Sequence, residues 1–173
     1  MQIPYQNHSP RIGSSVFLAP GSFVIGDVEI GEGSSLWFNS VVRGDVFPIR
    51  IGSKVNIQDN SVIHVTTGMH ATTVEDGVTV GHRVILHGCK VKAHALIGMG
   101  AVVMDGAEIG EESMIAAGSL VSPGTIIPPR VLAVGSPCRV KRPLREEEIQ
   151  SLHLSAEHYF ELAQNYQNRK SGL

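Results

Sequence analysis

The sequence predicts a mainly β protein in which short strands coil around one apolar core and a single helix follows them. The composition supports the strands: of 173 residues, 19 are glycine, only 17% are charged and only 5% are aromatic. Disorder is excluded because apolar residues make up 42% of the chain while its charge is low. A helical bundle is disfavoured because glycine and the many Val and Ile residues weaken helices.

An Ile, Leu or Val residue recurs every six positions through most of the chain, and we call these the marker residues. A small or β-branched residue commonly follows four positions later, where a corner needs little space. Each unit is therefore one short strand plus a corner, and because one unit cannot bury its apolar side alone, the units must coil and stack. The markers are Ile12, Leu18, Val24, Ile30, Leu36, Val42, Ile51, Ile57, Ile63, Val74, Val80, Leu86, Val91, Ile97, Val103, Ile109, Ile115, Val121 and Ile127.

This pattern resembles the hexapeptide-repeat family. The resemblance implies a left-handed parallel β-helix with three units per coil, which we assign to residues 1–143. A chain of alternating antiparallel strands is the other interpretation of short apolar segments. It is disfavoured because no hairpin turn pairs interrupt the repeat.

The tail, residues 144–173, changes character and predicts an amphipathic helix over roughly 145–169. Three consecutive acids suit the start of a helix, where they meet the positive end of its dipole. Apolar residues then recur at helical spacing. We expect this helix to pack on the β-helix or on a neighbouring subunit, and residues 170–173 to fray. The acids are Glu146, Glu147 and Glu148, and the apolar positions are Ile149, Leu152, Ala156, Tyr159, Phe160, Ala163 and Tyr166.

Arg43, His64 and His87 depart from the preference for small residues near the corners. Each follows its marker by one position, and units three apart place all three residues on one face. Adjacent coils are about 4.8 Å apart, so these side chains form a column. Two stacked histidines could each place a ring nitrogen ~2.0–2.1 Å from one Zn²⁺. The two longest units, after Val42 and Ile63, leave from the same face, where inserted loops commonly carry function.

His82 belongs to the preceding face, whose outward direction diverges from that of His64 and His87. We therefore expect His82 not to reach a metal held by the two histidines of its own chain. It would reach the site of an adjacent subunit instead. Three chains around a threefold axis would then build three equivalent sites.

Four motifs resemble the γ-class carbonic anhydrases, and the similarity covers nearly the whole chain. They are Val-Val-Arg-Gly-Asp, Val-Asn-Ile-Gln-Asp, Ile-His-Val-Thr and Val-Gly-His-Arg-Val-Ile-Leu-His-Gly-Cys. The resemblance implies a homotrimer with metal ligands shared across its interfaces. The implied residues are the ligands His64, His82 and His87, the interface ion pair Arg43 and Asp59, the polar site residues Asn56 and Gln58 with Asp45 nearby, and Tyr159 on the helix.

The implied activity is reversible hydration of carbon dioxide to bicarbonate. Three imidazoles suit Zn²⁺, Fe²⁺ or Co²⁺ and leave one position open for water, whose pKa a bound Zn²⁺ lowers to about 7. Gln58 would orient the hydroxide or bicarbonate by hydrogen bonding. The chain departs from the family in its proton route: Val46 follows Asp45, and residues 65–73 contain no acid. The sequence therefore predicts a metal site more strongly than fast turnover.

Two other classes of function stay open from the sequence. One is a hexapeptide acyltransferase or thioesterase-like enzyme, which would use a histidine base near a coenzyme A cleft. The other is a non-catalytic trimeric metal-binding or scaffold protein. His70, in the insertion after His64, would relay protons or be an ordinary loop residue, and we favour the second.

The net charge, the apolar stretches, the first residues and the cysteines limit which partners and which location we expect. The net charge of −2, with no basic run, gives no sign of nucleic-acid binding. No apolar stretch approaches the ~20 residues of a membrane span. Residues 1–10 do not resemble a signal peptide, and Cys89 and Cys138 give no disulfide framework, so we expect a cytoplasmic location.

Overall fold

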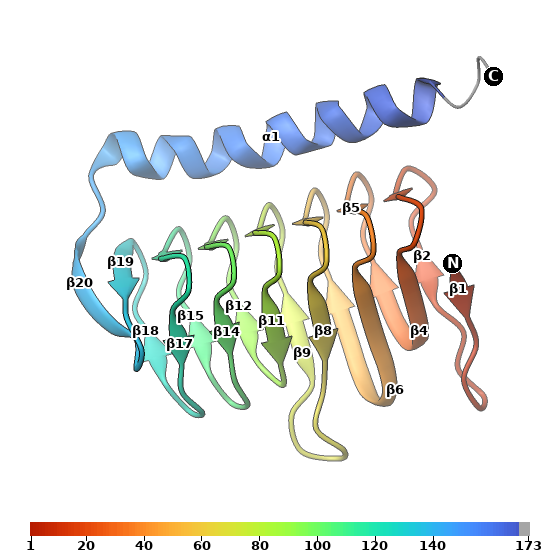
Figure 1. Ribbon diagram of the computed structural model, residues 1–173, viewed down its shortest axis with the longest axis horizontal. Coiled ribbons are helices and arrows are strands. Elements are labelled where there is room, and N and C mark those ends of the chain that lie inside the picture. Colours follow the sequence, from red (N-terminus) through yellow and green to blue (C-terminus); the bar gives the residue numbers. More distant parts are fainter. Residues whose placement is uncertain (170–173) are drawn as a thin grey trace.

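The computed structural model describes residues 1–169, which form a parallel β-helix with one long helix lying along it (Figure 1). The elements are β1 (Gln2–Ile3), β2 (Arg11–Ile12), β3 (Phe17–Leu18), β4 (Phe23–Ile30), β5 (Ser35–Leu36), β6 (Val41–Ile51), β7 (Asn56–Ile57), β8 (Val62–His64), β9 (Thr72–Val74), β10 (Thr79–Val80), β11 (Ile85–His87), β12 (Lys90–Val91), β13 (Leu96–Ile97), β14 (Val102–Val103), β15 (Glu108–Ile109), β16 (Met114–Ile115), β17 (Leu120–Val121), β18 (Ile126–Ile127), β19 (Val131–Val134), β20 (Arg139–Pro143) and α1 (Glu146–Arg169).

The strand register confirms that units three apart stack on each other. Val42 pairs with Ile63, Ile63 with Leu86, and Leu86 with Val103, all in parallel strands. The markers from Val24 onward are all buried and form one continuous core along the axis. Each marker fills the space between its neighbours above and below, so burial of the apolar surface is shared along the coil.

The coil has three faces, which differ in what covers them. The helix-covered face consists of β3, β5, β7, β10, β13, β16 and β19. The histidine face consists of β8, β11, β14 and β17 with the first halves of β4 and β6. The charged face consists of β2, β9, β12, β15 and β18 with the second halves of β4 and β6.

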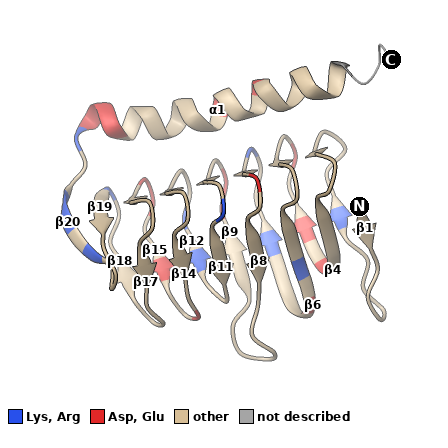
Figure 2. Cartoon of the chain, in the orientation of Figure 1, with Lys and Arg blue, Asp and Glu red and all other residues tan. Residues whose placement is uncertain are grey.

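The charged face carries solvent-exposed ionic side chains. Oppositely charged outward residues lie on neighbouring strands in two places, Arg11–Glu29–Arg50 and Lys90–Glu108, which Thr73 separates (Figure 2). Glu29 contacts both Arg11 and Arg50, and the Lys90 Nζ lies 2.9 Å from Glu108 Oε1. Such exposed pairs contribute little to stability, but they give this face a strongly hydrated surface.

Helix α1 begins one residue later than predicted and returns along the coil toward its N-terminal end (Figure 1). Leu152, Ala156 and Ala163 are buried against the coil, and Trp37 packs edge-on against Tyr159 with 5.6 Å between ring centroids. The predicted amphipathic helix is therefore confirmed and lies on the β-helix of its own chain. The expected fraying of 170–173 lies outside the described residues.

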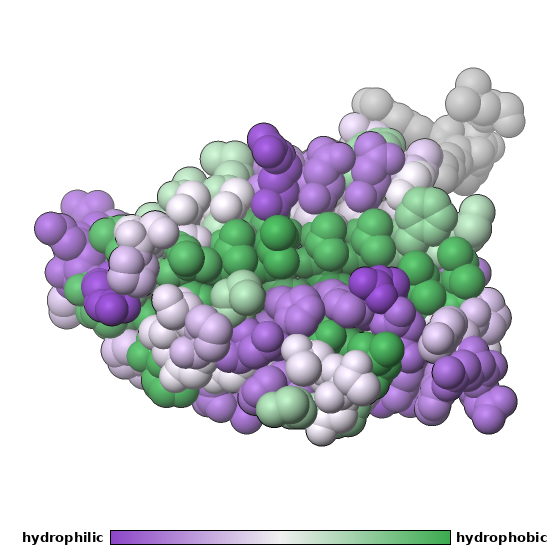
Figure 3. Space-filling model, turned by 60° about the horizontal axis from the view of Figure 1, so that its bottom comes forward, coloured by the Kyte–Doolittle hydropathy of each residue, from purple (hydrophilic) through white to green (hydrophobic). Residues whose placement is uncertain are grey.

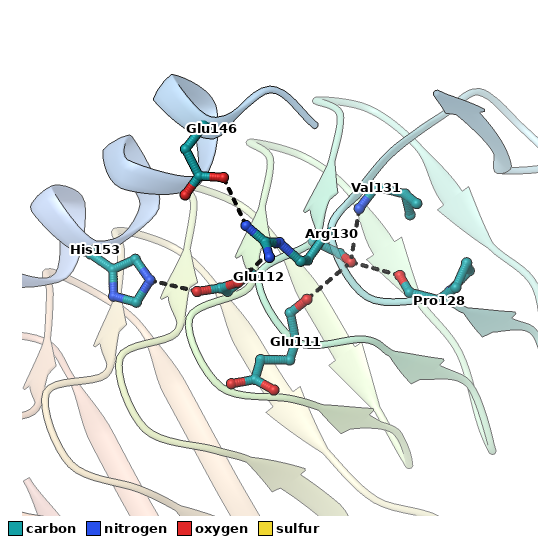
Figure 4. Close-up of polar contacts among 8 residues, drawn as sticks. Glu111, Glu112, Pro128, Arg130, Val131, Glu146 and His153 are labelled. Carbon is teal, nitrogen blue, oxygen red and sulfur yellow. Dashed lines mark hydrogen bonds and ion pairs between the residues drawn. The ribbon is translucent and has the colours of Figure 1, made fainter. Parts of the chain in front are cut away.

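One row of corner residues also binds α1 through side chains. The sequence offered no expectation for these corners beyond a preference for small residues. Instead, Glu112 and Arg130 adopt positive φ values of 53° and 57° there and contact the helix (Figure 4). Glu112 lies 2.8 Å from His153 Nε2, and Arg130 lies 2.9 Å from a carboxylate oxygen of Glu146. These contacts help to compensate for the strained backbone, which L residues adopt infrequently.

The two long units differ from each other. The unit after Val42, which we expected to insert a loop, instead lengthens β6 and pairs with β4 through an irregular register near Gly26. Because β4 already supplies a strand partner there, the extra residues extend the ladder. The unit after Ile63 does form a loop, closed by a bridge between Thr66 and His70.

The last coil is covered by the chain that follows it. The backbone of Leu120 bonds to Gly135 and Cys138, and β20 runs antiparallel to β19. At the third face, β18 is followed by Pro128 and Pro129, which have no backbone N–H to offer.

Both cysteines are buried free thiols. Desolvation raises the pKa of Cys89 to about 12, so this thiol stays protonated and unreactive at neutral pH. Among the described helices, none is both long and apolar enough to cross a membrane.

Candidate functional site

His64 and His87 are register partners on neighbouring coils of the histidine face. Each follows a buried marker, so its side chain points outward. The Nδ1 of His64 lies 3.2 Å from the Nε2 of His87. The predicted stacking of these two side chains is thus what the structure shows.

The other nitrogen of each ring is held by a carboxylate. The Nε2 of His64 lies 3.0 Å from Asp45 Oδ1, and the Nδ1 of His87 lies 2.9 Å from Asp105 Oδ1. Partial burial alone would raise the pKa of Asp45, but hydrogen bonds from His64 and Arg43 outweigh it and hold that pKa below its ordinary value. Partial burial would likewise raise the pKa of Asp105, but hydrogen bonds from Thr66 and His87 outweigh it and hold that pKa below its ordinary value.

These contacts assign a proton to the outer nitrogen of each ring. Ionised carboxylates only accept hydrogen bonds, so the outer nitrogens of His64 and His87 must be N–H donors. In two neutral imidazoles, the inner nitrogens are then both bare, and their lone pairs face each other across 3.2 Å. Such a pair attracts a cation. Two nitrogens bound tetrahedrally to one Zn²⁺ at ~2.0–2.1 Å would be about 3.3–3.4 Å apart, close to the observed spacing.

Arg43 lies in the same column and forms an ion pair with Asp45. Asp59 lies on the helix-covered side of the coil and contacts His82, with 2.8 Å between Oδ2 and Nδ1. Within the chain, therefore, Arg43 and Asp59 each have a different partner. The expected ion pair between Arg43 and Asp59 stays a prediction about two subunits.

Asn56, Gln58 and Tyr159 lie together at the edge of the helix-covered face. The Gln58 Nε2 donates to Asn56 Oδ1 at 3.0 Å, and both residues are buried. Burial and the nearby negative charge of Asp59 raise the pKa of Tyr159. Together with Asp59 and His82, these residues form a second cluster, apart from the stacked histidines.

The two clusters belong to different faces of one chain. Among residues 1–169, no group of three His, Cys, Asp or Glu side chains is placed to hold a metal ion. This agrees with the expectation that His82 serves a site other than that of its own His64 and His87, which stays a prediction.

Asp105 and Thr66 are site residues that sequence reasoning missed. Thr66 Oγ1 donates to Asp105 Oδ1 at 2.8 Å, which fixes the carboxylate that orients His87. A signal for Asp105 was available: it follows Val103, the marker stacked next to Leu86, by two positions. His70, whose role was open, lies beside this group and packs against Gly88 and Gly106.

An apolar band runs beside the histidine column. Its members occupy the position before each marker on the histidine face and pair with one another from coil to coil. Figure 3 shows this band as a continuous hydrophobic stripe with hydrophilic side chains along both margins. The band consists of Phe23, Val41, Val62, Ile85, Val102 and Leu120.

Comparisons with known proteins agree with this architecture. The family model of bacterial transferase hexapeptide (six repeats) matches residues 9–44 and 88–123. A carbonic anhydrase of Geobacillus kaustophilus is 50% identical over 166 residues, which cover 96% of this chain and 91% of that protein. The mitochondrial gamma carbonic anhydrase 1 of Arabidopsis thaliana is 45% identical over 161 residues, or 90% of this chain and 58% of that protein.

A solved structure gives the same result for the fold. A hexapeptide transferase family protein from Anaplasma phagocytophilum is 43% identical and has a TM-score of 0.92, with 95% of this chain and 97% of that chain covered. The repeat, the fold and the 45–50% sequence identity over nearly the whole chain together show that this chain belongs to the hexapeptide-repeat family, among its γ-carbonic anhydrase-like members.

Proposed function

We propose that this protein is a trimeric, metal-dependent carbonic anhydrase that hydrates carbon dioxide reversibly in the cytoplasm. The observation that carries the proposal is the position of His64 Nδ1 and His87 Nε2, which lie 3.2 Å apart while the other nitrogen of each ring contacts a carboxylate. Carboxylates behind metal-binding histidines fix the tautomer and strengthen the ligand. The donor set fits Zn²⁺, Co²⁺ or Fe²⁺.

The proposed trimer follows from the three faces of the coil. One face is covered by α1 and another is charged, whereas the histidine face carries the uncovered apolar band. Burying this band against a second copy would remove its apolar surface from water. The second copy would bring its His82, Asp59 and Gln58 beside the stacked histidines, so each site needs two chains.

In the proposed site, each residue has a separate task. His64, His87 and the neighbour's His82 hold the metal, and the Asp45 and Asp105 carboxylates keep two of these rings oriented. When bound, the metal supplies hydroxide at neutral pH by lowering the pKa of water. Gln58 orients the reactant by hydrogen bonding, and Arg43 pairs with Asp59 across the interface.

The carboxylates near the proposed site are poor proton acceptors. Asp45 and Asp105 both have lowered pKa values and are engaged with histidines, so they hold protons poorly near pH 7. The loop over residues 65–71 contains no acid, and its Met69 side chain is exposed. Turnover would therefore depend on proton acceptors from solution.

The direct test is to purify the protein anaerobically and measure its mass and its metal content. Carbon dioxide hydration is then assayed with Zn²⁺, Co²⁺ and Fe²⁺. We expect a trimer with about one metal per chain and measurable hydration with at least one metal. A His87→Ala variant should lose the metal, whereas His8→Ala, which alters an exposed histidine far from the site in sequence, should keep it.

Different results would contradict different parts of the proposal. Metal binding without hydration under every condition would remove the enzyme activity but keep the metal site. Full occupancy in His87→Ala would remove the site itself. A metal-free protein that binds coenzyme A would favour the acyltransferase alternative instead.

A further inference from the structure

A row of polar side chains lies buried beneath α1, where an apolar contact would be expected. The row is the position before each marker on the helix-covered face, and it is apolar at both ends. Its middle members Ser35, Asn56 and Thr79 are polar, yet they are at most 4% exposed. Burying polar groups has a free-energy cost that hydrogen bonds only offset. Leu96 and Met114, in the same row, show that apolar residues fit there.

Two of these polar residues, Asn56 and Thr79, take part in a chain of hydrogen bonds that leads from Gln58 to the helix. Gln58 Nε2 donates to Asn56 Oδ1 at 3.0 Å, and Asn56 Nδ2 donates to Thr79 Oγ1 at 2.9 Å. The Thr79 hydroxyl lies 3.1 Å from the Oγ of Ser155 on α1. Since Thr79 already accepts from Asn56, its own proton is free to be donated to Ser155. Every donor along the chain then points away from Gln58 and toward α1.

The direction of this chain determines which end of the Gln58 amide faces the site. The Nε2 of Gln58 donates to Asn56, whereas its Oε1 accepts no hydrogen bond from the described residues. Ser155 itself has little freedom to leave, because it sits next to Ala156 and one turn from Leu152, both buried. The helix therefore holds the Ser155 end of this chain of hydrogen bonds in place. We call the chain from Gln58 through Asn56 and Thr79 to Ser155 the relay.

We propose that Thr79 and Ser155 are positioning residues that act through Asn56 to fix the Gln58 amide with its oxygen toward the reactant. The proposal rests on the function proposed above, because it gives Gln58 a reactant to meet. With Oε1 presented, Gln58 is a hydrogen-bond acceptor. It would hold a reactant by an O–H group, as water, hydroxide and hydrogen carbonate offer.

The test uses the whole chain in its metal-loaded form, the variants Thr79→Val, Ser155→Ala and Ser151→Ala, and a rescue variant, Thr79→Ser. Thr79→Val keeps the shape of the side chain but removes its hydroxyl, and Ser155→Ala breaks the relay from the helix side. Ser151→Ala is the matched control, because Ser151 is exposed on the same helix and its side chain bonds only to the carbonyl of Glu148 among the described residues. Metal content and mass are measured first, and we expect all four variants to match the wild type.

The first readout does not depend on activity. Hydrogen exchange of the Gln58 side-chain amide is followed by NMR in protein labelled at glutamine. Thr79→Val and Ser155→Ala should speed this exchange about tenfold or more, whereas Ser151→Ala should not. The backbone N–H of Gln58, which donates to the carbonyl of Val80, is an internal control and should keep its protection in all variants. Unchanged side-chain exchange in both relay variants would overturn the proposal.

The second readout is the rate of carbon dioxide hydration. We expect kcat to fall about tenfold in Thr79→Val, corresponding to the loss of one oriented hydrogen bond, and KM to change little. Thr79→Ser, which restores a hydroxyl, should recover most of kcat. Faster side-chain exchange with unaltered kcat would overturn the positioning role. If the wild type shows no hydration, the proposed function fails, and the exchange measurement alone then decides whether the relay fixes Gln58.

Discussion

Asp105 lies one coil beyond His87, and its carboxylate accepts a hydrogen bond from the Nδ1–H of that histidine at 2.9 Å. The contact sets the ring so that Nε2 faces His64. It is the kind of outer contact that tunes a metal ligand without touching the metal. Its removal should weaken metal binding while leaving the coil intact, because both residues point away from the core.

Asp105→Asn should weaken Zn²⁺ binding about 10- to 100-fold. The amide keeps an oxygen that can accept from His87, but the negative charge that raises the basicity of the ring is lost. Competition with a chromophoric chelator measures the change. Glu108→Gln, on the charged face of the same coil, is the control and should bind Zn²⁺ like the wild type. Equal affinity in both variants would show that Asp105 does not support a ligand.

Mixing two inactive variants tests whether the metal site is shared between subunits. His82→Ala keeps the stacked pair, and His64→Ala keeps His82, so neither variant alone should hold the metal. On co-refolding with random association, about a quarter of interfaces would combine an intact pair with an intact His82. Metal occupancy and hydration should reappear to that extent.

The control mixture combines His64→Ala with His87→Ala. Every interface then lacks one member of the stacked pair, so no site should be restored. Recovery in this mixture, or failure of the first mixture to recover, would contradict a site built from His82 of one chain and the stacked pair of another.

A charge in the apolar band should prevent assembly. Ile85 pairs with Val62 on one side and Val102 on the other, so Ile85→Arg places a cation in the middle of the band. We expect this variant to be monomeric in sedimentation and to lose its metal. Ile126→Arg is the control: Ile126 is more exposed, at 64% against 41% for Ile85, but lies on the charged face. Dissociation in both variants would argue against a specific interface.

Exogenous buffer should accelerate hydration at saturating carbon dioxide. Asp45 and Asp105 have lowered pKa values and so accept protons poorly near pH 7. A soluble base such as imidazole, whose pKa lies near the working pH, is a more effective acceptor. Stopped-flow measurements over a range of imidazole concentrations should show kcat rising several-fold. A kcat that is independent of buffer would reveal an internal proton route, for which His70 is the first candidate.

Acid should weaken the contacts that hold the start of α1 to β20, because Glu148 loses its charge. Hydrogen bonds from Arg142 and from the backbone of Arg145 hold the pKa of Glu148 well below its ordinary value of 4.5. A carboxyl with a lowered folded-state pKa contributes stability above about pH 4.5, and this contribution is lost as the pH falls below that value. The midpoint temperature of thermal unfolding should therefore fall less between pH 7 and pH 3 in Glu148→Gln than in the wild type. Glu147→Gln, which changes an exposed neighbour in the same turn, should follow the wild-type curve.

The coil and its faces could be predicted because they depend on a period that is written in the sequence. Once Val42, Ile63 and Leu86 are recognised as units three apart, the stacking of His64 on His87 follows from strand register alone.

Other features depend on distances that the period does not contain. The hydrogen bond from His87 to Asp105 requires the length of both side chains and the turn of the chain between them. Whether extra residues form a loop or a longer strand depends on a partner, and β4 provides one for β6 but not for the loop that holds His70. The contacts of Glu112 and Arg130 with α1 require knowing where the helix lies. Each of these is decided by the meeting of segments far apart in the chain.

The covering of the last coil limits how this molecule can polymerise. A stack of parallel strands ends in open peptide groups, and an identical molecule could continue the ladder, as happens in fibrils. Here β20 occupies one of those edges, the backbone of Gly135 and Cys138 satisfies a second, and Pro128 and Pro129 interrupt the third. End-to-end growth is thereby blocked at this terminus. Association side by side, where contacts can close into a ring of fixed size, is not blocked in this way.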